Sequence, residues 1–546
     1  MAVNPPAPRR LTKSIMESLR ASVPSLAEVS IATGSALLLV LAFPDFDLWP
    51  LAWIAFAPLL VVVAVSERPA RVFLLGWLWG AIFFYGSCWW LTYPMIHYAS
   101  IPSYGHIPAW LAYALLLLPV LLVALFPALF CLLLAQVIAR LGIAGILISP
   151  FVWITLELAR YAITGEAWNA LGYSQAFHPS LIHSARWGGF YAVSFLIVTT
   201  NAAFAFALLR RTVLAATCSA VILVTVLLAL VITHLQTISE PEFSRGPGNL
   251  IVAVQPNVPM AGSDDPVTMQ ELLNRHLQLS VKGLSEERNS HPDSSLVIWP
   301  ESPMNFSYWR DSHLRDVIGS FARNHHTSVL LNSLEPAPGG GEYNSAILIN
   351  EEGQKVAQYD KIRLMPFGEY VPLPRWLPGA SSVRGIVGEF TPGSSFTLMP
   401  LGGLRVGVFI CIEAAHPSIA RRFANEGADG FVNISNDGYL GPTAVMRQHL
   451  ANAVFRAVEN DRPLLRVTNS GISASIDSKG RIWSPTHAFE TAVRAWDVDR
   501  ETNARTFYSR HGDVFVYVCA LISLGFISAS FMTRRMRIGR SVNRRG

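Results

Sequence analysis

The chain has few charged residues for its length. Asp, Glu, Lys and Arg make up 14% of its 546 residues, and 51% are hydrophobic, whereas a soluble protein carries about 25% charged residues. This deficit predicts that many side chains face lipid instead of water. The net charge of +5 is small, and the basic residues lie mostly at the termini and in short loops. We therefore expect no nucleic-acid partner, because such a partner requires a basic face on a folded domain.

Cysteine is also scarce, and its distribution is informative. Four of the five cysteines, Cys88, Cys131, Cys218 and Cys519, lie in apolar stretches, which leaves Cys411 alone in the polar part of the chain. This pattern excludes a disulfide framework and makes Cys411 a candidate nucleophile. The sequence contains no H-x-x-x-H or C-x-x-C pair, so it predicts no zinc site and no cofactor.

Eight apolar runs predict a helical membrane bundle of about eight spans. A helical span needs about 20 apolar residues; the first run is short, and the fourth contains Pro119 and Pro127, which predict a kink. No small-residue cleavage site follows the first run, so we expect it to be retained. Glu157 and Arg160 lie three residues apart inside the fifth run, where they either pair with each other or shape an entrance for lipid. The runs fall at 29–43, 48–65, 72–93, 109–138, 143–163, 189–209, 213–235 and 513–532.

The arginines in the loops predict how the spans are oriented. With the N-terminus in the cytoplasm, the loops predicted to lie inside carry most of the loop arginines, and the tail after residue 532 holds six more. This agrees with the positive-inside rule and places both termini in the cytoplasm. The expected parts are a cytoplasmic basic segment at 1–24, seven spans at 25–238, an extracytoplasmic domain at 239–511, a last span at 512–533 and a cytoplasmic basic tail at 534–546.

The polar region between the seventh and eighth spans alternates strand and helix patterns. Short β-rich apolar runs predict strands, and helical patterns lie between several of them. The strand patterns are almost continuously apolar, which is typical of an α/β domain whose sheets are covered on both faces. The strands are predicted at 250–255, 295–298, 328–331, 343–350, 405–410, 430–434, 464–468 and 472–477, and the helices at 267–286, 313–324, 416–426 and 443–461.

Three reactive side chains stand at strand ends or in the loops just beyond them: Glu301, Lys361 and Cys411. Together they supply a general base, an oxyanion stabiliser and a nucleophile. A free thiol has a pKa of about 8.5 and needs a base. Glu301, if desolvation raised its pKa, would take the thiol proton, while Lys361 would favour the thiolate and stabilise the oxyanion. The N–H of Ile412 is expected to be a second oxyanion donor.

Each of these residues also has a structural interpretation when taken alone. A buried cysteine is often an inert small hydrophobe, Glu301 resembles a turn acid, and Lys361 resembles a solvated charge. His416 lies close to Cys411, but Glu301 already fills the role of base, so we do not assign His416 that role. His449 is expected to cap or pack on its helix.

The motifs that contain these residues occur in an order that resembles the nitrilase superfamily and, more closely, the apolipoprotein N-acyltransferase family. The resemblance covers nearly the whole chain. It implies an extracytoplasmic αββα sandwich and a Glu301–Lys361–Cys411 triad. It also implies that Glu369 is a supporting carboxylate that orients Lys361 or a substrate, and it makes Glu413 a weaker candidate for the same role. For both residues, direct catalysis and structural pairing stay open as alternatives. The motifs are Trp299-Pro-Glu301, the block from Lys361 to Pro372, Cys411-x-Glu413, Ser435-Asn-Asp437, Gln448-His449, Arg456-Ala457, Glu459-Asn460, Arg462-Pro463 and Thr468-Asn469-Ser470-Gly471.

The resemblance also implies an activity. The family transfers an acyl chain from a phospholipid, through a thioester, to the N-terminal diacylglyceryl-cysteine of bacterial lipoproteins. The expected partners are therefore a phospholipid donor, a diacylated apolipoprotein acceptor and membrane lipid. The expected location is the bacterial inner membrane, with the catalytic domain on the periplasmic side, and we expect a monomer.

The chain departs from the family pattern at three places. The family commonly has an aromatic residue where Ile412 stands, Trp-Phe-Gly where Gly438-Tyr439-Leu440-Gly441 stands, and Lys-Trp near 261–264. None of these changes removes the triad, but each concerns the substrate pocket. Two alternatives stay open: a membrane-tethered amidase or nitrile hydrolase that uses water as acceptor, and an inactive nitrilase-like binding module.

Overall fold

The computed structural model divides the chain into two compact units. The helical unit comprises Met1–Ser174, Tyr191–Leu230 and Val514–Gly546, and the sheet unit comprises Gln175–Phe190 and Val231–Asp513. The basic segment at 1–22 and the stretch at 261–264 lie outside the described residues. The described residues are 23–66, 68–98, 100–101, 105–239, 249–260, 266–287, 295–301, 306–371, 390–401, 403–498 and 504–542.

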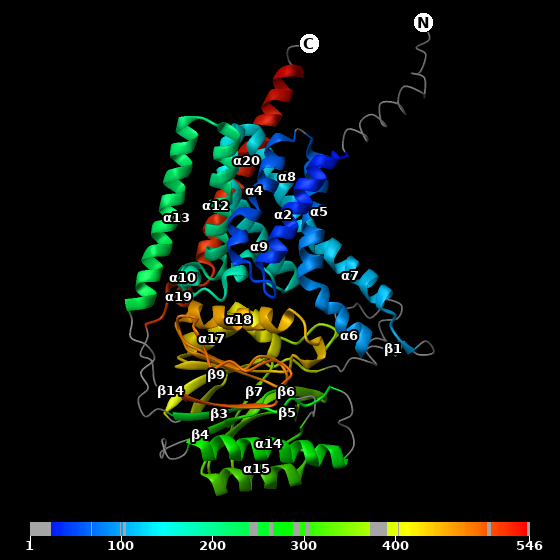
Figure 1. Ribbon diagram of the computed structural model, residues 1–546, viewed down its shortest axis with the longest axis vertical. Helices are drawn as coiled ribbons and strands as arrows, with labels where there is room; N and C mark the ends of the chain where they lie inside the picture. The colour runs from blue at the N-terminus through cyan, green and yellow to red at the C-terminus, as the bar shows by residue number, and fades with distance from the viewer. Residues whose placement is uncertain are drawn as a thin grey trace. The chain divides into compact units, whose positions relative to one another are not determined.

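The helical unit is built almost entirely from apolar helices (Figure 1). Within the described part of the chain, five stretches are long and apolar enough to cross a membrane: Pro69–His97, Ala109–Thr164, Phe190–Arg210, Val213–Gln236 and Val514–Phe531. The helices are α2 (Leu26–Ala42), α3 (Ala52–Ala55), α4 (Ala57–Val65), α5 (Pro69–Cys88), α6 (Thr92–His97), α7 (Ala109–Val123), α8 (Leu125–Leu141), α9 (Ser149–Thr164), most of α12 (Phe190–Arg210), the first part of α13 (Val213–Ser239) and α20 (Val514–Val542).

The predicted class of a membrane bundle is confirmed, but the predicted count of about eight spans is not. The first two predicted runs form the apolar helices Leu26–Ala42 and Trp49–Val65. A helix of 17 residues, such as α2, is about 26 Å long at about 1.5 Å per residue, less than a hydrocarbon core of about 30 Å. The fourth and fifth predicted runs fall within the single stretch Ala109–Thr164. Inside that stretch α7 ends at Val123 and α8 begins at Leu125, between the two prolines that predicted a kink.

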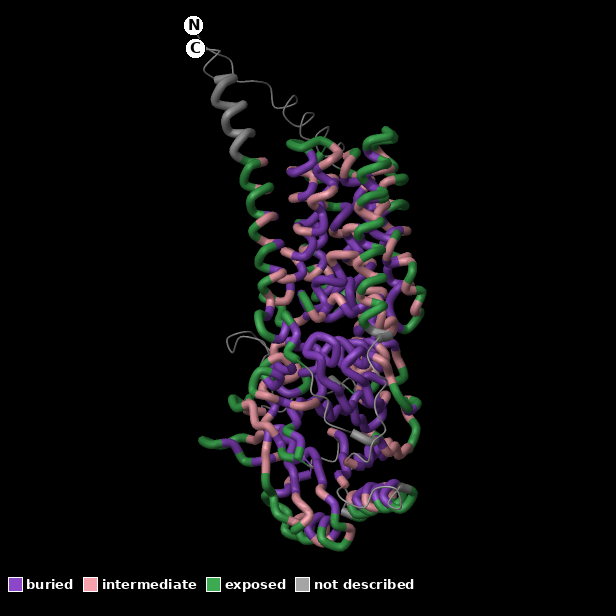
Figure 2. Tube along the Cα trace, turned by 90° about the vertical axis from the view of Figure 1, so that its left-hand side faces the viewer, coloured by how far each residue is buried: buried purple, intermediate pink, exposed green. Residues whose placement is uncertain are grey.

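Large apolar side chains cover the outside of the helical unit. Figure 2 shows long green runs of exposed residues along its helices. The exposed apolar side chains include Leu214 and Leu228 on α13 and Leu521 on α20. Helices that are apolar on all sides suit lipid surroundings. In the interior, aromatic rings pack edge to face, as Phe56 does on Trp153 with ring centroids 4.7 Å apart.

Glu157 and Arg160 bind a neighbouring loop, and no ion pair joins these two described side chains. Oε1 of Glu157 accepts hydrogen bonds from Nε1 of Trp153 at 2.9 Å and from the N–H of Leu171 at 3.0 Å. Arg160 donates to the carbonyl oxygen of Trp168 at 2.9 Å. The two side chains act on each other electrostatically, but their hydrogen bonds go to Trp153 and to the loop after α9.

The sheet unit is a four-layer αββα sandwich, as predicted (Figure 1). Each sheet has six strands, with three parallel strands at its centre: β3, β4 and β5 in one sheet, and β9, β10 and β11 in the other. The first sheet has the order β14 (Ala492–Val498), β3 (Asn249–Gln255), β4 (Ser295–Ile298), β5 (Ser328–Pro336), β6 (Glu342–Ile349) and β7 (Lys355–Asp360). The second has the order β13 (Ile482–Trp483), β12 (Ala474–Ile476), β11 (Leu464–Thr468), β10 (Gly430–Ser435), β9 (Leu404–Ile410) and β8 (Leu398–Leu401).

Helices cover the outer face of each sheet. The helices α14 (Pro266–Glu287) and α15 (Ser312–His325) pack on the first sheet, and α17 (Pro417–Glu426) and α18 (Val445–Asn460) on the second. Local sequence sets their ends: Asp311 caps α15 by accepting from the N–H of Leu314 at 3.0 Å, and α17 begins with Pro417 and stops at Gly427, whose φ is +95°. Each large aliphatic side chain buried between helix and sheet contributes about 1.5–3 kcal/mol.

All eight predicted strands and all four predicted helices of this unit are present, with ends that shift by a few residues. The edge strands β7, β8, β13 and β14 were not predicted. They are short or partly polar, so their alternation does not stand out from that of loops.

Candidate active site

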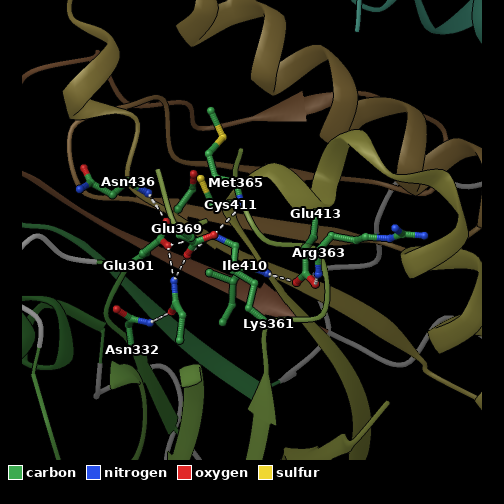
Figure 3. A network of polar contacts seen from close by, with 12 residues as sticks. Glu301, Asn332, Lys361, Arg363, Met365, Glu369, Ile410, Cys411, Glu413 and Asn436 are labelled. Atoms are coloured by element: carbon green, nitrogen blue, oxygen red, sulfur yellow. Dashed lines mark hydrogen bonds and ion pairs between the residues drawn. The ribbon is translucent and has the colours of Figure 1, made fainter. Parts of the chain in front are cut away.

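The three predicted reactive residues come from both sheets. Glu301 lies just beyond the carboxyl end of β4 and Lys361 directly follows β7, so both belong to the first sheet. Cys411 directly follows β9 of the second sheet. The three side chains meet where these strand ends come together, and Figure 3 shows the Cys411 sulfur beside the carboxylates of Glu301 and Glu369.

Cys411 stands at a sharp turn. Its φ is +52°, in the left-handed region that non-glycine residues rarely adopt, and it opens the 3-10 turn Cys411–Ala415. Its side chain is buried, and the residue is 4% exposed. The N–H of Ile412 belongs to the first residues of this turn, where a helical segment leaves N–H groups without internal partners. The backbone beside the sulfur can therefore serve a substrate oxygen.

Lys361 is a buried ammonium held between two carboxylates. Its Nζ lies 2.9 Å from Oε1 of Glu369 and 3.3 Å from Oε1 of Glu301, and Lys361 is 1% exposed. Burial alone would lower the pKa of Lys361, but Glu301 and Glu369 outweigh this effect and raise the pKa well above its usual value. Lys361 therefore keeps its charge and cannot act as a base near neutral pH.

The Cys411 sulfur rests as a thiol in this setting. Burial raises the pKa of Cys411 well above its usual value, the Glu301 carboxylate adds to the rise, and Lys361 offsets it only in part. If the sulfur acts as a nucleophile, as the sequence predicts, it must lose its proton during the attack. Glu301 is the carboxylate that acts most strongly on the thiol.

Two asparagines fix the carboxylates: Asn344, which the sequence analysis missed, and Asn436, which lies in the Ser435-Asn-Asp437 motif. Nδ2 of Asn344 donates to Oε1 of Glu301 at 2.8 Å and to Oε1 of Glu369 at 2.7 Å. The N–H of Asn436 donates to Oε2 of Glu301 at 3.1 Å, and Nδ2 of Asn332 orients the Asn344 amide at 2.7 Å. The available signal was a run of polar residues, at 343–345, at the start of an otherwise apolar strand pattern.

Glu413 forms a structural pairing away from the ammonium. Its Oε1 accepts from the hydroxyl of Tyr359 at 2.8 Å and from the N–H groups of Ile362 at 2.8 Å and Arg363 at 3.0 Å. Its Oε2 accepts from the N–H of Ile410 at 2.8 Å. The fully buried Glu413 thus ties the turn after β9 to the loop after β7. Glu369, by contrast, contacts Lys361 directly.

Tyr439 occupies part of the site where the chain departs from the family pattern. Its hydroxyl lies 3.6 Å from Sδ of Met365, and the N–H of Met365 donates to Oε2 of Glu369 at 2.7 Å. Burial, followed by the nearby Cys411 and Glu301, raises the pKa of Tyr439 well above its usual value. Tyr439 therefore presents a neutral hydroxyl close to the thiol.

The two histidines near Cys411 lie in different surroundings. His416 precedes α17, and burial lowers its pKa to about 3, so it stays neutral. His449 lies on α18 but does not cap that helix: its ring bridges Asp437 and the backbone of Cys411. No cluster of metal-ligating side chains occurs among the residues that the structure describes.

Comparisons with known proteins agree with the two-unit organisation. A family model described as the apolipoprotein N-acyltransferase N-terminal domain matches residues 35–203, and one described as carbon-nitrogen hydrolase matches residues 275–507. An apolipoprotein N-acyltransferase from Geobacter metallireducens is 33% identical over 498 residues, which cover 90% of this chain and 92% of the relative. One from Allorhizobium ampelinum is 31% identical over 492 residues, which cover 86% of this chain and 90% of the relative. Among solved structures, an amidase from Nesterenkonia sp. is 18% identical with a TM-score of 0.37, and the match covers 51% of this chain and 99% of the amidase.

Proposed function

Because the chain belongs to the apolipoprotein N-acyltransferase family, we propose that it N-acylates the N-terminal diacylglyceryl-cysteine of bacterial lipoproteins. The acyl donor is a phospholipid, and Cys411 carries the acyl chain as a thioester between two half-reactions. Glu301 is the general base and acid, and Lys361 stabilises the oxyanion. Glu369 holds Lys361 in place, while Glu413 fixes the turn that carries Cys411.

In the first half-reaction the thiol proton moves to Glu301 as the sulfur attacks an ester carbonyl of the phospholipid. The tetrahedral oxyanion is stabilised by the Lys361 ammonium and the N–H of Ile412. When the intermediate collapses, the carbon–oxygen bond breaks and the leaving alkoxide takes the proton from Glu301. The products are lysophospholipid and an acylated Cys411.

In the second half-reaction the α-amine of the lipoprotein attacks the thioester. An α-amine has a pKa of about 8, so a minority is neutral at neutral pH and nucleophilic. Glu301 takes the proton that the amine loses, the carbon–sulfur bond breaks, and the proton returns to Cys411. The enzyme ends in its starting state, and the lipoprotein carries a third acyl chain.

The observation that supports this proposal best is the charge arrangement around the thiol. A buried ammonium cannot accept a proton, and one carboxylate, Glu301, acts directly on both Lys361 and Cys411. Proton acceptor, oxyanion stabiliser and nucleophile are thus distinct groups within one buried cluster, as acyl transfer requires.

We further propose that the sheet unit works at the periplasmic face of the inner membrane. The expected parts remain a bundle at 25–238, a catalytic domain at 239–511 and a last span at 512–533, with both termini in the cytoplasm. The five apolar stretches support membrane insertion, and the loop arginines support this orientation. The working form is a monomer.

The test incubates the purified protein with isotope-labelled phospholipid and a synthetic diacylated lipopeptide. Mass spectrometry should find the acyl mass first on the Cys411 peptide and then on the lipopeptide amine, with lysophospholipid as the other product. Cys411→Ser is the matched variant, because it replaces only the sulfur, and it should form neither product. Transfer by this variant at the wild-type rate would contradict the nucleophile assignment.

The same experiment separates the two alternatives. A hydrolase that uses water would release free fatty acid or ammonia without acylating the lipopeptide. An inactive binding module would leave Cys411 unmodified.

A further inference from the structure

The buried side chains of His449 and Asp437 lie next to the backbone of Cys411, the proposed nucleophile, and have no role in the mechanism above. Nδ1 of His449 is 2.9 Å from Oδ1 of Asp437, and Nε2 of His449 is 3.0 Å from the carbonyl oxygen of Cys411. His449 is 2% exposed and Asp437 is 1% exposed. The imidazole ring thus joins an aspartate to the main chain of Cys411.

The backbone that His449 contacts is strained. A left-handed φ costs an ordinary residue of order 1 kcal/mol or more and persists only where the surroundings hold it. Cys411 has such a φ, and the direction of its side chain depends on it. Its carbonyl oxygen also lies 3.4 Å from Nδ2 of Asn433, which is a longer contact than that with His449. Of these two side-chain restraints on the carbonyl, His449 is therefore the stronger.

Asp437 is ionised where it meets the ring. Its Oδ2 accepts from Nη2 of Arg466 at 2.6 Å, and its Oδ1 accepts from the hydroxyl of Ser435 at 2.8 Å. Burial alone would raise the pKa of Asp437, but Arg466 and His449 outweigh it and hold the pKa far below its usual value. An ionised carboxylate can only accept hydrogen bonds.

Both oxygens that face His449 are therefore acceptors. A carbonyl oxygen has no proton to donate, and neither does an ionised carboxylate. A neutral imidazole has one N–H and would leave a lone pair facing one of these two oxygens. Only the imidazolium, with an N–H on each nitrogen, satisfies both contacts.

We propose that His449 is a positioning residue that works as an imidazolium and holds the Cys411 turn in its reactive conformation. It donates Nδ1–H to Asp437 and Nε2–H to the carbonyl oxygen of Cys411. This inference rests on the proposed role of Cys411 as nucleophile and goes beyond the triad. In this role His449 acts through the main chain and not on a reacting atom.

Several charged groups act on the ring from the elements around it. Burial, followed by Arg466 on β11, lowers the pKa of His449 below its usual value, and Asp437 beyond β10 and the hydrogen bond to Cys411 offset this only in part. The two hydrogen bonds favour the cation, because each is of normal length and each requires an N–H. The imidazolium also balances the negative charge of Asp437 alongside Arg466.

Two substitutions separate positioning from packing. His449→Leu keeps an apolar side chain of similar length but has no donor, whereas His449→Gln retains an amide N–H that can reach the carbonyl. A misplacement of about 1 Å costs roughly 100-fold in rate, so we expect His449→Leu to lower kcat by about 10- to 100-fold. KM for the lipopeptide should stay unchanged, because a positioning residue acts on the main chain of Cys411 and not on the substrate. His449→Gln should recover part of kcat.

His416→Leu is the matched control. His416 is a buried histidine five residues beyond Cys411 that has no role in the mechanism proposed above, so its replacement should leave kcat of the folded protein unchanged. A wild-type kcat in folded His449→Leu would overturn the proposal. So would a change confined to KM, since the residue would then act on substrate binding.

Ring protonation is measured on the unaltered enzyme, so the proposal stays testable even if His449→Leu does not fold. The full-length protein is labelled with ¹⁵N-histidine in lipid, and its spectrum is compared with that of His449→Gln to identify the His449 signals. At neutral pH both ring nitrogens should resonate as N–H nitrogens. One unprotonated nitrogen would overturn the proposal. This readout needs no turnover, so its failure is distinct from failure to detect an acylated Cys411.

Discussion

Replacing Glu301 by glutamine should make Cys411 more reactive toward a small alkylating agent while abolishing acyl transfer. The Glu301 carboxylate raises the pKa of the thiol, so removing its charge lowers that pKa. The same substitution removes the proposed general base, and a general base is typically worth about 10²- to 10⁴-fold in rate. In Glu301→Gln the rate of Cys411 alkylation should therefore rise while the rate of acyl transfer falls.

The expected fall in the pKa of Cys411 in Glu301→Gln can be worked out from electrostatics. Two unit charges about 4 Å apart interact with about 4 kcal/mol at an effective dielectric constant of about 20. Glu301 is partly exposed and already forms an ion pair with Lys361, so we take at most about half of this interaction energy. Removing the carboxylate would then lower the pKa of Cys411 by about 1–2 units. Thiolate at pH 7 would then rise about 10- to 100-fold, and the lower basicity of the sulfur reduces the gain in alkylation rate to about 3- to 10-fold.

The assay follows carbamidomethylation of the Cys411 peptide by iodoacetamide at about pH 7, where the resting thiol is mostly protonated. Glu369→Gln is the matched control, because Glu369 contacts Lys361 but is not among the main influences on the thiol. It should change the alkylation rate less than Glu301→Gln does. Equal or slower alkylation in Glu301→Gln would refute the charge arrangement described above.

Three other outcomes are expected. Glu413→Gln should lower the free energy of unfolding by about 1–3 kcal/mol, because the carboxylate accepts four hydrogen bonds from two segments that it ties together; a lower thermal midpoint with activity kept in the folded fraction would support this, and a wild-type midpoint with lost activity would indicate direct catalysis. Asn344→Asp should reduce acyl transfer by about 100-fold or more, since it replaces two donors by a third negative charge beside Glu301 and Glu369; a transfer rate within a few-fold of wild type would contradict this. Burial lowers the pKa of His416 to about 3, below the unfolded value of about 6.5, so the unfolded state binds a proton that the folded state does not. This part of the stability is present above about pH 6.5 and falls by up to about 1.4 kcal/mol per pH unit toward lower pH; thermal midpoints from pH 7 to 4 should drop less steeply for His416→Leu.

The sequence predicts the strands that carry the site because their signals are local. An apolar run followed by Glu301 or Cys411 is visible without knowing its neighbours, and the order of such motifs indicates the family. Asn344 is different, because its contact with Glu301 exists only once β6 has paired with β7 and the two side chains meet in the folded domain. His449 is a stronger case: its partners come from two other segments, so a helical pattern alone suggests only packing.

The span count is not confirmed, for a related reason. Hydropathy counts apolar residues, but a crossing also depends on where helices stop, and α2 stops after 17 residues. The segment Gln175–Phe190, which contains the short helices α10 (Pro179–Ile182) and α11 (Ala185–Gly188), shows the same limit, because its association with the sheet unit arises from tertiary contacts. Composition and periodicity contain no information about such contacts.

The division of the reactive groups between two sheets has a consequence for how the enzyme matures. Glu301 and Lys361 follow strands of one sheet, and Cys411 follows a strand of the other. A newly made chain whose sheets have not yet docked holds its sulfur apart from the base and the ammonium. Such a precursor lacks the assembled site, so competence for acyl transfer requires that the two sheets have docked.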